Sequence, residues 1–267
     1  MFVITVGELD GVPRIVASLN PSVNEFLALI GVDLAGVDVF SYRPRELQQK
    51  RKVGTFIDID VEAVERLRPD LIILYYPVQR HILETASRLA KAVVAVPTPT
   101  GVDHVAAIFK FFAKIFDRDE EGDRIAGIYR DLLRGAVIYQ NVAAVINLGT
   151  YEMPCRNSWV AETLSRVGLV YIKTAPCIFK QFKEPPTLEG VEFVVYEARG
   201  KKPQEAAFLG ERPHVITPND TLAHYGPSHP IDLLGVAEAA ARGARLVKEA
   251  SSVLRPSLRD DWYKPYR

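Results

Sequence analysis

The chain has 267 residues, more than a usual single domain, so two lobes of roughly 110 to 130 residues each are expected, and the 48% of apolar residues suffice for a core in each. Lys and Arg total 33 and so do Asp and Glu, so no net field would draw nucleic acid or an anionic membrane. No apolar run reaches the ~18 residues of a membrane-spanning helix. These numbers argue against a nucleic-acid partner and against a membrane-spanning protein.

The N-terminal stretch predicts two strands, over residues 2–6 and 12–18, that pair as a hairpin. A helix is expected from Ser22 to about Ile30, and Gly31 follows where a left-handed residue ends a helix. The chain therefore passes from a strand through a polar elbow into a helix.

The start of this helix carries a capping pattern. Ser22 and Glu25 stand in the Ser-x-x-Glu spacing in which both side chains bond to free backbone N–H groups. Glu25 also brings negative charge to the positive end of the helix dipole. No glycine-rich phosphate motif adjoins the elbow. We expect a rigid, neutral ledge rather than a phosphate site.

The rest of the first hundred residues alternates strands with helices. Asp60 is predicted to cap a short helix, which Pro69 ends. The apolar run 71–76 is typical of a strand buried on both faces of a parallel sheet. This alternation indicates a doubly wound α/β lobe. The predicted elements are strands at 35–39, 71–76 and 92–96 and helices at 60–67 and 79–90.

Two amphipathic helices follow this lobe. Apolar residues recur with a 3.6-residue period over 103–116 and again over 125–133, on either side of the charged stretch 117–123. We expect a helical connector rather than a flexible linker. Beyond it the predicted strands are near 142–148, 169–172, 191–196 and 214–217, and the predicted helices near 158–167 and 230–249.

The two cysteines, Cys155 and Cys177, show neither metal-ligand spacing nor a disulfide framework. We expect two ordinary thiols. A single bridge is the alternative, for a hyperthermophilic source in which internal disulfides occur.

Three separated segments carry a family resemblance. They are Arg14-Ile-Val-Ala-Ser-Leu-Asn-Pro-Ser-Val-Asn-Glu through Gly31, the pair Val53-Gly54, and Asp60-Val-Glu-Ala-Val-Glu-Arg-Leu-Arg-Pro-Asp-Leu-Ile-Ile-Leu. These segments resemble the N-terminal lobe of the class III substrate-binding proteins, which serve ABC importers for vitamin B12, ferric siderophores and haem. The helical connector and Tyr225-Gly-Pro-Ser-His-Pro are similar to the rest of that fold. The matches are strong over the first 75 residues and weak after residue 137.

The resemblance implies an α/β fold of two Rossmann-like lobes, residues 1–102 and 137–267, joined by a rigid long helical connector over 103–136, with a ligand cleft between the lobes. It implies a monomeric, non-catalytic protein without a cofactor, which binds a corrinoid, ferric siderophore or haem-like ligand and meets an ABC permease. The alternative is an intracellular enzyme or cofactor-handling protein on the same scaffold, because fold does not fix function.

The same resemblance assigns ligand contacts. It places the polar elbow in the cleft, aromatic contacts near Pro44 and at a strand end, and a further contact loop before the last helix. These positions are Asn20, Ser22, Asn24, Tyr42, Tyr75 and Tyr225.

Other candidates rest on side-chain chemistry. Because neighbouring strand residues point to opposite faces, one of Tyr75 and Tyr76 should reach the cleft, and Tyr75 is the choice. Arg43 could bind a ligand carboxylate or phosphate, or be a solvated loop charge. Trp159 could look into the cleft or belong to the core.

Metal and docking residues are less well specified. His224 and His229, with Asp220, are weak metal candidates because they lie on a loop whose geometry the spacing leaves undetermined. Importer docking in the family uses one exposed glutamate on each lobe, for which Glu205 is a match on the second lobe and Glu84 a substitute on the first.

The N-terminus lacks the features of a secretory leader. We expect a cytoplasmic protein if the chain is complete and an extracytoplasmic one if a leader has been removed.

Overall fold

The computed structural model describes residues 3–198, 203–217 and 220–243. Two compact units share these residues. The first unit holds the described residues up to Thr98 together with Ala106–Gly127. The second holds Pro99–Val105 and the described residues from Ile128 onward. Each unit contains one six-stranded sheet, so the α/β class and the pair of lobes are confirmed.

The sheet of the first unit has the strand order β1-β6-β5-β2-β3-β4. Its strands are β1 (Ile4–Gly7), β2 (Val16–Ser18), β3 (Gly36–Val37), β4 (Arg51–Lys52), β5 (Leu71–Tyr76) and β6 (Ala92–Pro97). All neighbours are parallel except β1, which pairs antiparallel with β6. The predicted β1–β2 hairpin is therefore wrong. The fully buried β2 takes parallel partners on both sides, whereas the more exposed β1 lies at the edge.

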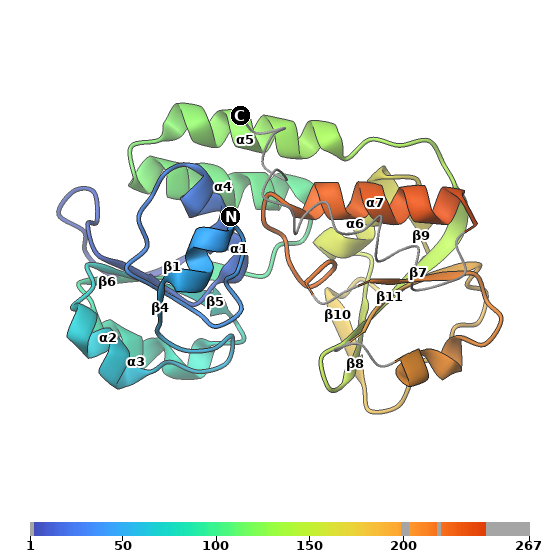
Figure 1. Ribbon diagram of the computed structural model, residues 1–267, viewed down its shortest axis with the longest axis horizontal. Helices are drawn as coiled ribbons and strands as arrows, with labels where there is room; N and C mark the ends of the chain where they lie inside the picture. The colour runs from blue at the N-terminus through green and yellow to red at the C-terminus, as the bar shows by residue number, and fades with distance from the viewer. Residues whose placement is uncertain (1–2, 199–202, 218–219, 244–267) are drawn as a thin grey trace. The chain divides into compact units, whose positions relative to one another are not determined.

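Helices cover both faces of this sheet (Figure 1). Helix α1 (Pro21–Leu29) lies on one face, where Phe26 stacks at 4.6 Å on Phe109 of α4 (Val102–Ile115). Helices α2 (Val61–Leu67) and α3 (Leu83–Leu89) lie on the other face, with the short 3-10 helices η1 (Arg45–Gln49) and η2 (Arg80–Ile82) in the connections. The doubly wound arrangement predicted from the strand–helix alternation is confirmed.

Helix α1 begins differently from the prediction. Its N-cap is Asn20, whose Oδ1 accepts a hydrogen bond from the Val23 backbone N–H at 3.3 Å. Pro21 occupies the first helical position. A backbone N–H at this position would have no partner within the helix, so the missing N–H of proline costs nothing, and its fixed φ suits the helix. The Ser22–Glu25 capping box is therefore wrong, and Glu25 is fully buried instead. The predicted stop at Gly31 is confirmed by its φ of +79°.

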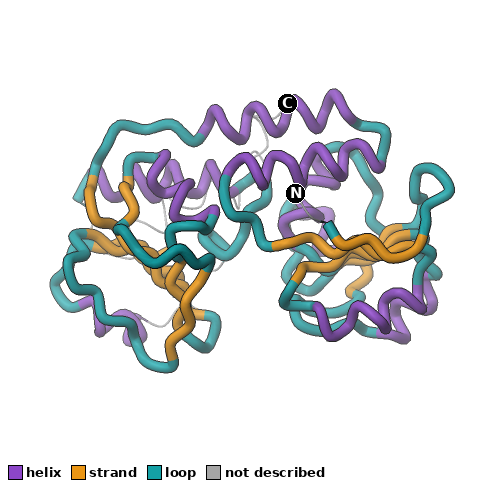
Figure 2. Tube along the Cα trace, turned by 180° about the vertical axis from the view of Figure 1, so that it is seen from behind, coloured by secondary structure: helices purple, strands orange, loops and turns teal. Residues whose placement is uncertain are grey.

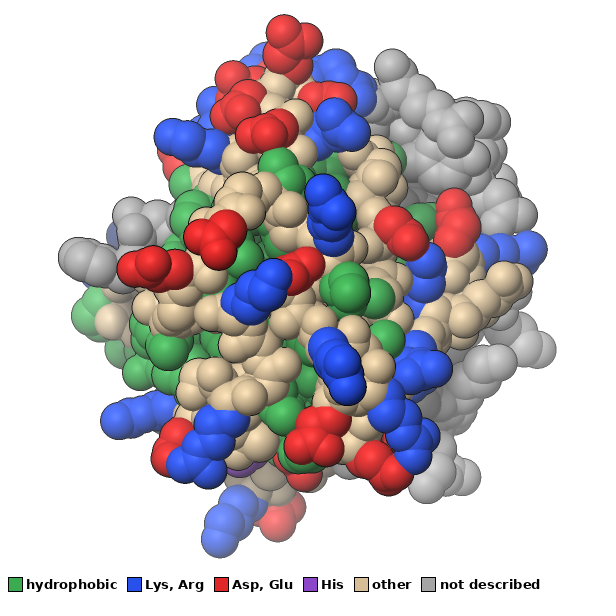
Figure 3. Space-filling model, turned by 90° about the vertical axis from the view of Figure 1, so that its left-hand side faces the viewer, with side chains coloured by type: hydrophobic (Ala, Val, Ile, Leu, Met, Phe, Trp, Pro, Cys, Tyr) green, Lys and Arg blue, Asp and Glu red, His purple; other side chains and the backbone are tan. Residues whose placement is uncertain are grey.

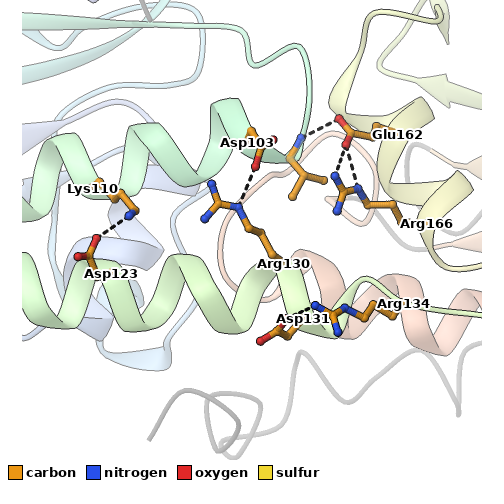
Figure 4. A network of polar contacts seen from close by, with 9 residues as sticks. Asp103, Lys110, Asp123, Arg130, Asp131, Arg134, Glu162 and Arg166 are labelled. Atoms are coloured by element: carbon orange, nitrogen blue, oxygen red, sulfur yellow. Dashed lines mark hydrogen bonds and ion pairs between the residues drawn. The ribbon is translucent and has the colours of Figure 1, made fainter.

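Helix α4 and helix α5 (Asp119–Leu132) run antiparallel, and ion pairs join them (Figure 4). Lys110 Nζ lies 2.7 Å from Asp123 Oδ1, and Arg130 Nε lies 2.8 Å from Asp103 Oδ1. Acidic residues in the first turn of α5 favour its start, so most of the expected charged break is helical. The boundary between the two units falls within both helices. A rigid connector remains a prediction.

The start of α4 is capped by a side chain of helix α6 (Trp159–Arg166) in the same unit. Glu162 Oε2 accepts the Val102 backbone N–H at 3.0 Å, while Arg166 pairs with the other carboxylate oxygen (Figure 4). A Cβ at Gly101 would lie 2.2 Å from Glu162 Oε2, so a larger residue would displace this carboxylate from the cap.

The second sheet has the strand order β10-β8-β7-β11-β12, with β9 also paired to β7. Strand β8 pairs antiparallel with β7 and β10, and the remaining pairs are parallel. Strands β8 and β10 were not predicted from the sequence. The bounds are β7 (Tyr139–Asn147), β8 (Tyr151–Pro154), β9 (Leu169–Tyr171), β10 (Phe179–Phe182), β11 (Phe193–Glu197) and β12 (His214–Thr217).

A disulfide joins Cys155 to Cys177, so the expectation of two free thiols is wrong. The β8–β10 pairing continues past the strand ends, where the Cys155 N–H donates to Ile178 O at 2.7 Å. This brings the two Cα atoms within 5.1 Å, a separation that suits a disulfide. The bridge could not be inferred without these two strands.

Helices α6 and α7 (His229–Ala241) lie on one face of the second sheet, and the 3-10 helix η3 (Pro203–Leu209) lies on the other (Figure 1, Figure 2). Ser158 caps α6 by accepting the Ala161 N–H at 3.1 Å. The predicted last helix is confirmed up to Ala241, and its expected continuation to residue 249 lies largely outside the described residues.

None of the helices in the described part of the chain has the length and apolar character needed to cross a bilayer. On the face drawn in Figure 3, acidic and basic side chains are interspersed. This matches the balanced composition of the sequence.

Candidate functional site

The carboxyl edge of the first sheet is held together by Gln79, which is 1% exposed. Its Oε1 accepts the Tyr75 N–H at 2.6 Å, and its Nε2 donates to Leu19 O at 3.1 Å and to Phe56 O at 2.9 Å. One amide therefore ties the ends of β2 and β5 to the loop after β4. Loops that follow parallel strands at this edge are the usual ligand-binding elements of α/β sheets.

Large apolar side chains are exposed on these loops. Val39 and Phe40 follow β3, Ile57 follows β4, and Val78 follows β5. Phe40 is 48% and Ile57 63% exposed, and Phe56 packs against the Tyr75 ring at 5.4 Å. The Val39 N–H donates to Gly54 O, so the loops after β3 and β4 adjoin. An exposed apolar edge is a surface suited to a partly apolar ligand.

A buried polar network supports the loop that carries Phe40. Asp38 accepts from the Phe40 N–H at 2.7 Å, from the Ser41 hydroxyl, and from Asn24 Nδ2 at 3.2 Å. Lys52 Nζ donates to the carbonyl groups of Asp38, Ser41 and Leu47. Burial raises the pKa of Asp38 and lowers the pKa of Lys52, while each charge favours the ionised form of the other. The network fixes the shape of the loop.

The predicted elbow residues lie beneath this surface. Asn20 caps α1, Ser22 is 4% exposed, and Asn24 is fully buried in the network of Asp38. Asn24 also donates to the Ser41 hydroxyl at 2.8 Å and so helps to position the loop after β3. Direct contact of the elbow residues with a ligand remains a prediction.

Tyr42 and Arg43 lie together on the loop after β3. The Arg43 guanidinium carbon is 5.4 Å from the centroid of the Tyr42 ring, a cation–π contact. Arg43 is 5% exposed, whereas its neighbour Arg45 is exposed. Arg43 is therefore not a freely solvated loop charge, and its role toward a ligand remains a prediction.

Tyr75 and Tyr76 point to opposite faces of the sheet, as predicted. Tyr76 packs with the apolar cluster that includes Ile72 and Leu74, on the face covered by α2 and α3. Tyr75 points the other way and is 8% exposed, with its ring against Phe56. Only a small part of the Tyr75 ring is thus available to a ligand.

An aromatic cluster lies in the second unit. The Trp159 ring makes edge contacts with Phe179 at 5.2 Å and with Tyr225 at 5.8 Å. Trp159 and Tyr225 are each 2% exposed, so the core alternative for Trp159 holds. Within the described part of the chain, the Trp159 Nε1 atom has no hydrogen-bond partner.

The two histidine candidates for a metal are both buried. His229 uses both ring nitrogens in hydrogen bonds, with Nδ1 2.9 Å from Thr221 O and Nε2 3.1 Å from Thr163 Oγ1. Among the described residues, no three His, Cys, Asp or Glu side chains are grouped so as to hold a metal ion. The ring of His229 serves to join α7 to α6 and to the preceding loop.

The two docking candidates differ in what the structure shows of them. Glu84 is exposed on α3 and forms an ion pair with Arg88. Glu205 belongs to η3, and its side chain lies outside the described residues.

Sequence reasoning missed three residues of this site. Gln79, Phe40 and Lys52 were not among the residues predicted to form the site. Phe40 and Gln79 follow predicted strands, which was the available signal, whereas no strand was predicted next to Lys52. Their importance depends on contacts with loops distant in sequence.

Each unit is an α/β unit built on a mixed sheet, and the first has an exposed apolar carboxyl edge. These features suit a protein that binds a solute. The chain belongs to the periplasmic binding protein family, whose model matches residues 16–175. The members of this family are binding proteins rather than enzymes. No curated protein matches the chain.

Solved structures with the same fold include three proteins of known ligand. A periplasmic haem binding protein from Pseudomonas aeruginosa has a TM-score of 0.67 at 21% identity, covering 88% of this chain and 95% of that one. The catecholate-siderophore binding protein VctP of Vibrio cholerae has a TM-score of 0.68 at 11% identity, covering 89% and 100%. The vitamin B12 binding protein BtuF of Vibrio cholerae has a TM-score of 0.63 at 15% identity, covering 85% and 98%.

Proposed function

We propose that this protein is the substrate-binding component of an ABC-type importer and that it binds a corrinoid, a ferric siderophore or a haem-like ligand. The observation that carries the proposal is the apolar carboxyl edge of the first sheet, where Phe40 and Ile57 are exposed on loops held by the Asp38 network and by Gln79. Family membership and the ligands of structural relatives support the same class.

The site combines apolar contact area with a few polar groups. Phe40, Ile57 and the edge of Tyr75 would contact a macrocycle or an aromatic chelator. Arg43, held over the Tyr42 ring, would orient a ligand carboxylate. The predicted position of the ligand between two lobes, the contact by Tyr225 and the monomeric state belong to this proposal.

Delivery to a permease would use exposed acidic residues. Glu84 is accessible on α3 for this purpose, and Glu205 is the candidate in the second unit. An extracytoplasmic location accords with the Cys155–Cys177 disulfide, since such bonds persist in oxidising compartments.

A ligand panel tests the proposal. Cobalamin, haemin and ferric desferrioxamine are each added to the purified protein and thermal unfolding is followed. A ligand at ~100 times its dissociation constant should stabilise the protein by about 2.7 kcal/mol. The absence of any shift with all three compounds would contradict the proposed ligand class.

A substitution then locates the ligand. Phe40→Ala should weaken binding of the responding compound by about 1 to 3 kcal/mol in calorimetry, because the ring supplies exposed contact area. Val12→Ala is the matched control, since Val12 is 44% exposed and lies outside the loops of this edge. Equal affinities for the two variants would remove Phe40 from the site.

A further inference from the structure

A buried carboxylate stands at the carboxyl end of β11 in the second unit. Glu197 is 1% exposed, and its oxygens accept backbone N–H groups from a segment more than twenty residues away. Oε1 accepts from Asp220 at 3.1 Å, and Oε2 accepts from Leu222 and, at 3.2 Å, from Ala223. One side chain therefore binds three N–H groups of the segment 220–223.

A charge in this place disfavours folding. Burial, together with the nearby Asp220 carboxylate, raises the pKa of Glu197 to about 8, although the three N–H groups favour the ionised form. A glutamine would avoid the charge but would turn its own NH₂ group toward backbone donors. Both oxygens of a carboxyl group can accept a hydrogen bond, whereas the nitrogen of a glutamine amide cannot.

The segment that Glu197 holds leads directly to the aromatic cluster. The Thr221 carbonyl accepts from His229 Nδ1 at 2.9 Å, which fixes the segment to the start of α7. Asp220 has a left-handed backbone with φ of +65°. Between these fixed points lies Tyr225, whose ring meets Trp159 at 5.8 Å.

We propose that Glu197 is a positioning residue: its carboxyl group holds the backbone of residues 220–223 and thereby fixes the placement of Tyr225, the ligand contact that the family resemblance predicts. The part that concerns the ligand rests on the proposed function. The part that concerns the segment rests on the hydrogen bonds alone.

Other ionisable groups adjoin this segment. In loop 220–228 and the first turn of α7 they are Asp220, His224, Tyr225, His229 and Asp232. Of these, Asp220 is the one whose charge raises the pKa of Glu197.

The test compares Glu197→Gln with the wild-type protein by amide hydrogen exchange at pH 8.5. The amide nitrogen must face either Asp220 or the pair Leu222 and Ala223, and exchange at the residues it faces should become at least tenfold faster in the variant. The melting temperature should stay equal or rise, because a buried charge is removed. Glu211→Gln, at an exposed position, should leave both quantities unchanged. Unchanged exchange, or equal acceleration of all core amides, would overturn the proposal.

The pH dependence of stability gives a second measurement. A carboxyl whose pKa is raised by folding stabilises the protein fully below its unfolded value of 4.5, and this contribution is lost as the pH rises toward about 8. The melting temperature of wild type should fall over this range, and Glu197→Gln should remove that part of the fall. Identical pH profiles would contradict the proposal.

Two further arms keep the outcomes distinct. If Glu197→Gln does not fold, Asp220→Asn removes the neighbouring charge and should slow exchange at Leu222; no change would count against the proposal. Affinity for haemin, cobalamin and ferric desferrioxamine is measured last. For the compound that wild type binds, the affinity of Glu197→Gln should be at least tenfold lower. If wild type binds none, the proposed function fails, and the exchange data still decide the role of Glu197.

Discussion

The carboxyl edges of the two sheets differ in what they present. The first exposes Phe40 on a loop that the buried Asp38 network holds, and Ile57 on a loop that Gln79 holds. The second buries a carboxyl group, Glu197, which binds three backbone N–H groups of the segment 220–223. The first edge thus offers contact area, whereas the second fixes the position of a segment. The following predictions test how much the bonds that hold each unit contribute to its stability.

The largest expected effect concerns the disulfide of the second unit. Replacing Cys155 and Cys177 with serine should lower the free energy of unfolding by about 3 kcal/mol, because the bridge closes a loop of 22 residues in the unfolded chain. Urea denaturation measures the change. Reductant should shift the wild-type midpoint toward that of the double variant and leave the double variant unaffected; no shift would contradict the expectation.

The next effect concerns the amide that organises the first unit. Gln79→Leu should lower the free energy of unfolding by about 2 kcal/mol, because the Tyr75 N–H and the Leu19 and Phe56 carbonyls lose a buried partner. Urea denaturation gives the value. Gln49→Leu, at an exposed position, is the control, and equal stability of the two variants would show that Gln79 does not hold this edge.

The smallest effect is a pH dependence within the first unit. Asp70 accepts the Arg14 and Ile15 N–H groups and pairs with Lys91, and these contacts, the Lys91 bond first, lower its pKa from 3.8 to about 2. The stabilisation is present above pH 4 and lost as the pH falls toward 2. It should amount to about 1 kcal/mol, because Lys91 is exposed.

Chemical denaturation between pH 2.5 and 6 measures this contribution of Asp70 to the free energy of unfolding. Asp70→Asn should flatten the acid limb of the stability profile. Asp33→Asn removes an ion pair whose carboxylate is 85% exposed and should leave that limb unchanged. Parallel profiles for wild type and Asp70→Asn would contradict the assignment.

The sequence by itself determined the elements whose signals are local. The apolar run 71–76 has the bounds of β5, Asp60 caps α2, and the 3.6-residue periods mark α4 and α5. These features depend on propensity, capping and periodicity, which neighbouring residues carry. The family resemblance rested on the same local runs.

The tertiary structure alone decided the partners of those elements. The β1–β6 pairing, the β8–β10 pair with its disulfide and the three N–H bonds to Glu197 join residues far apart in the chain. Which of two adjacent tyrosines is available, and that Phe40 is exposed while Trp159 is buried, also depend on packing. Burial and pairing follow from the free energy of the whole fold, which a local pattern does not specify.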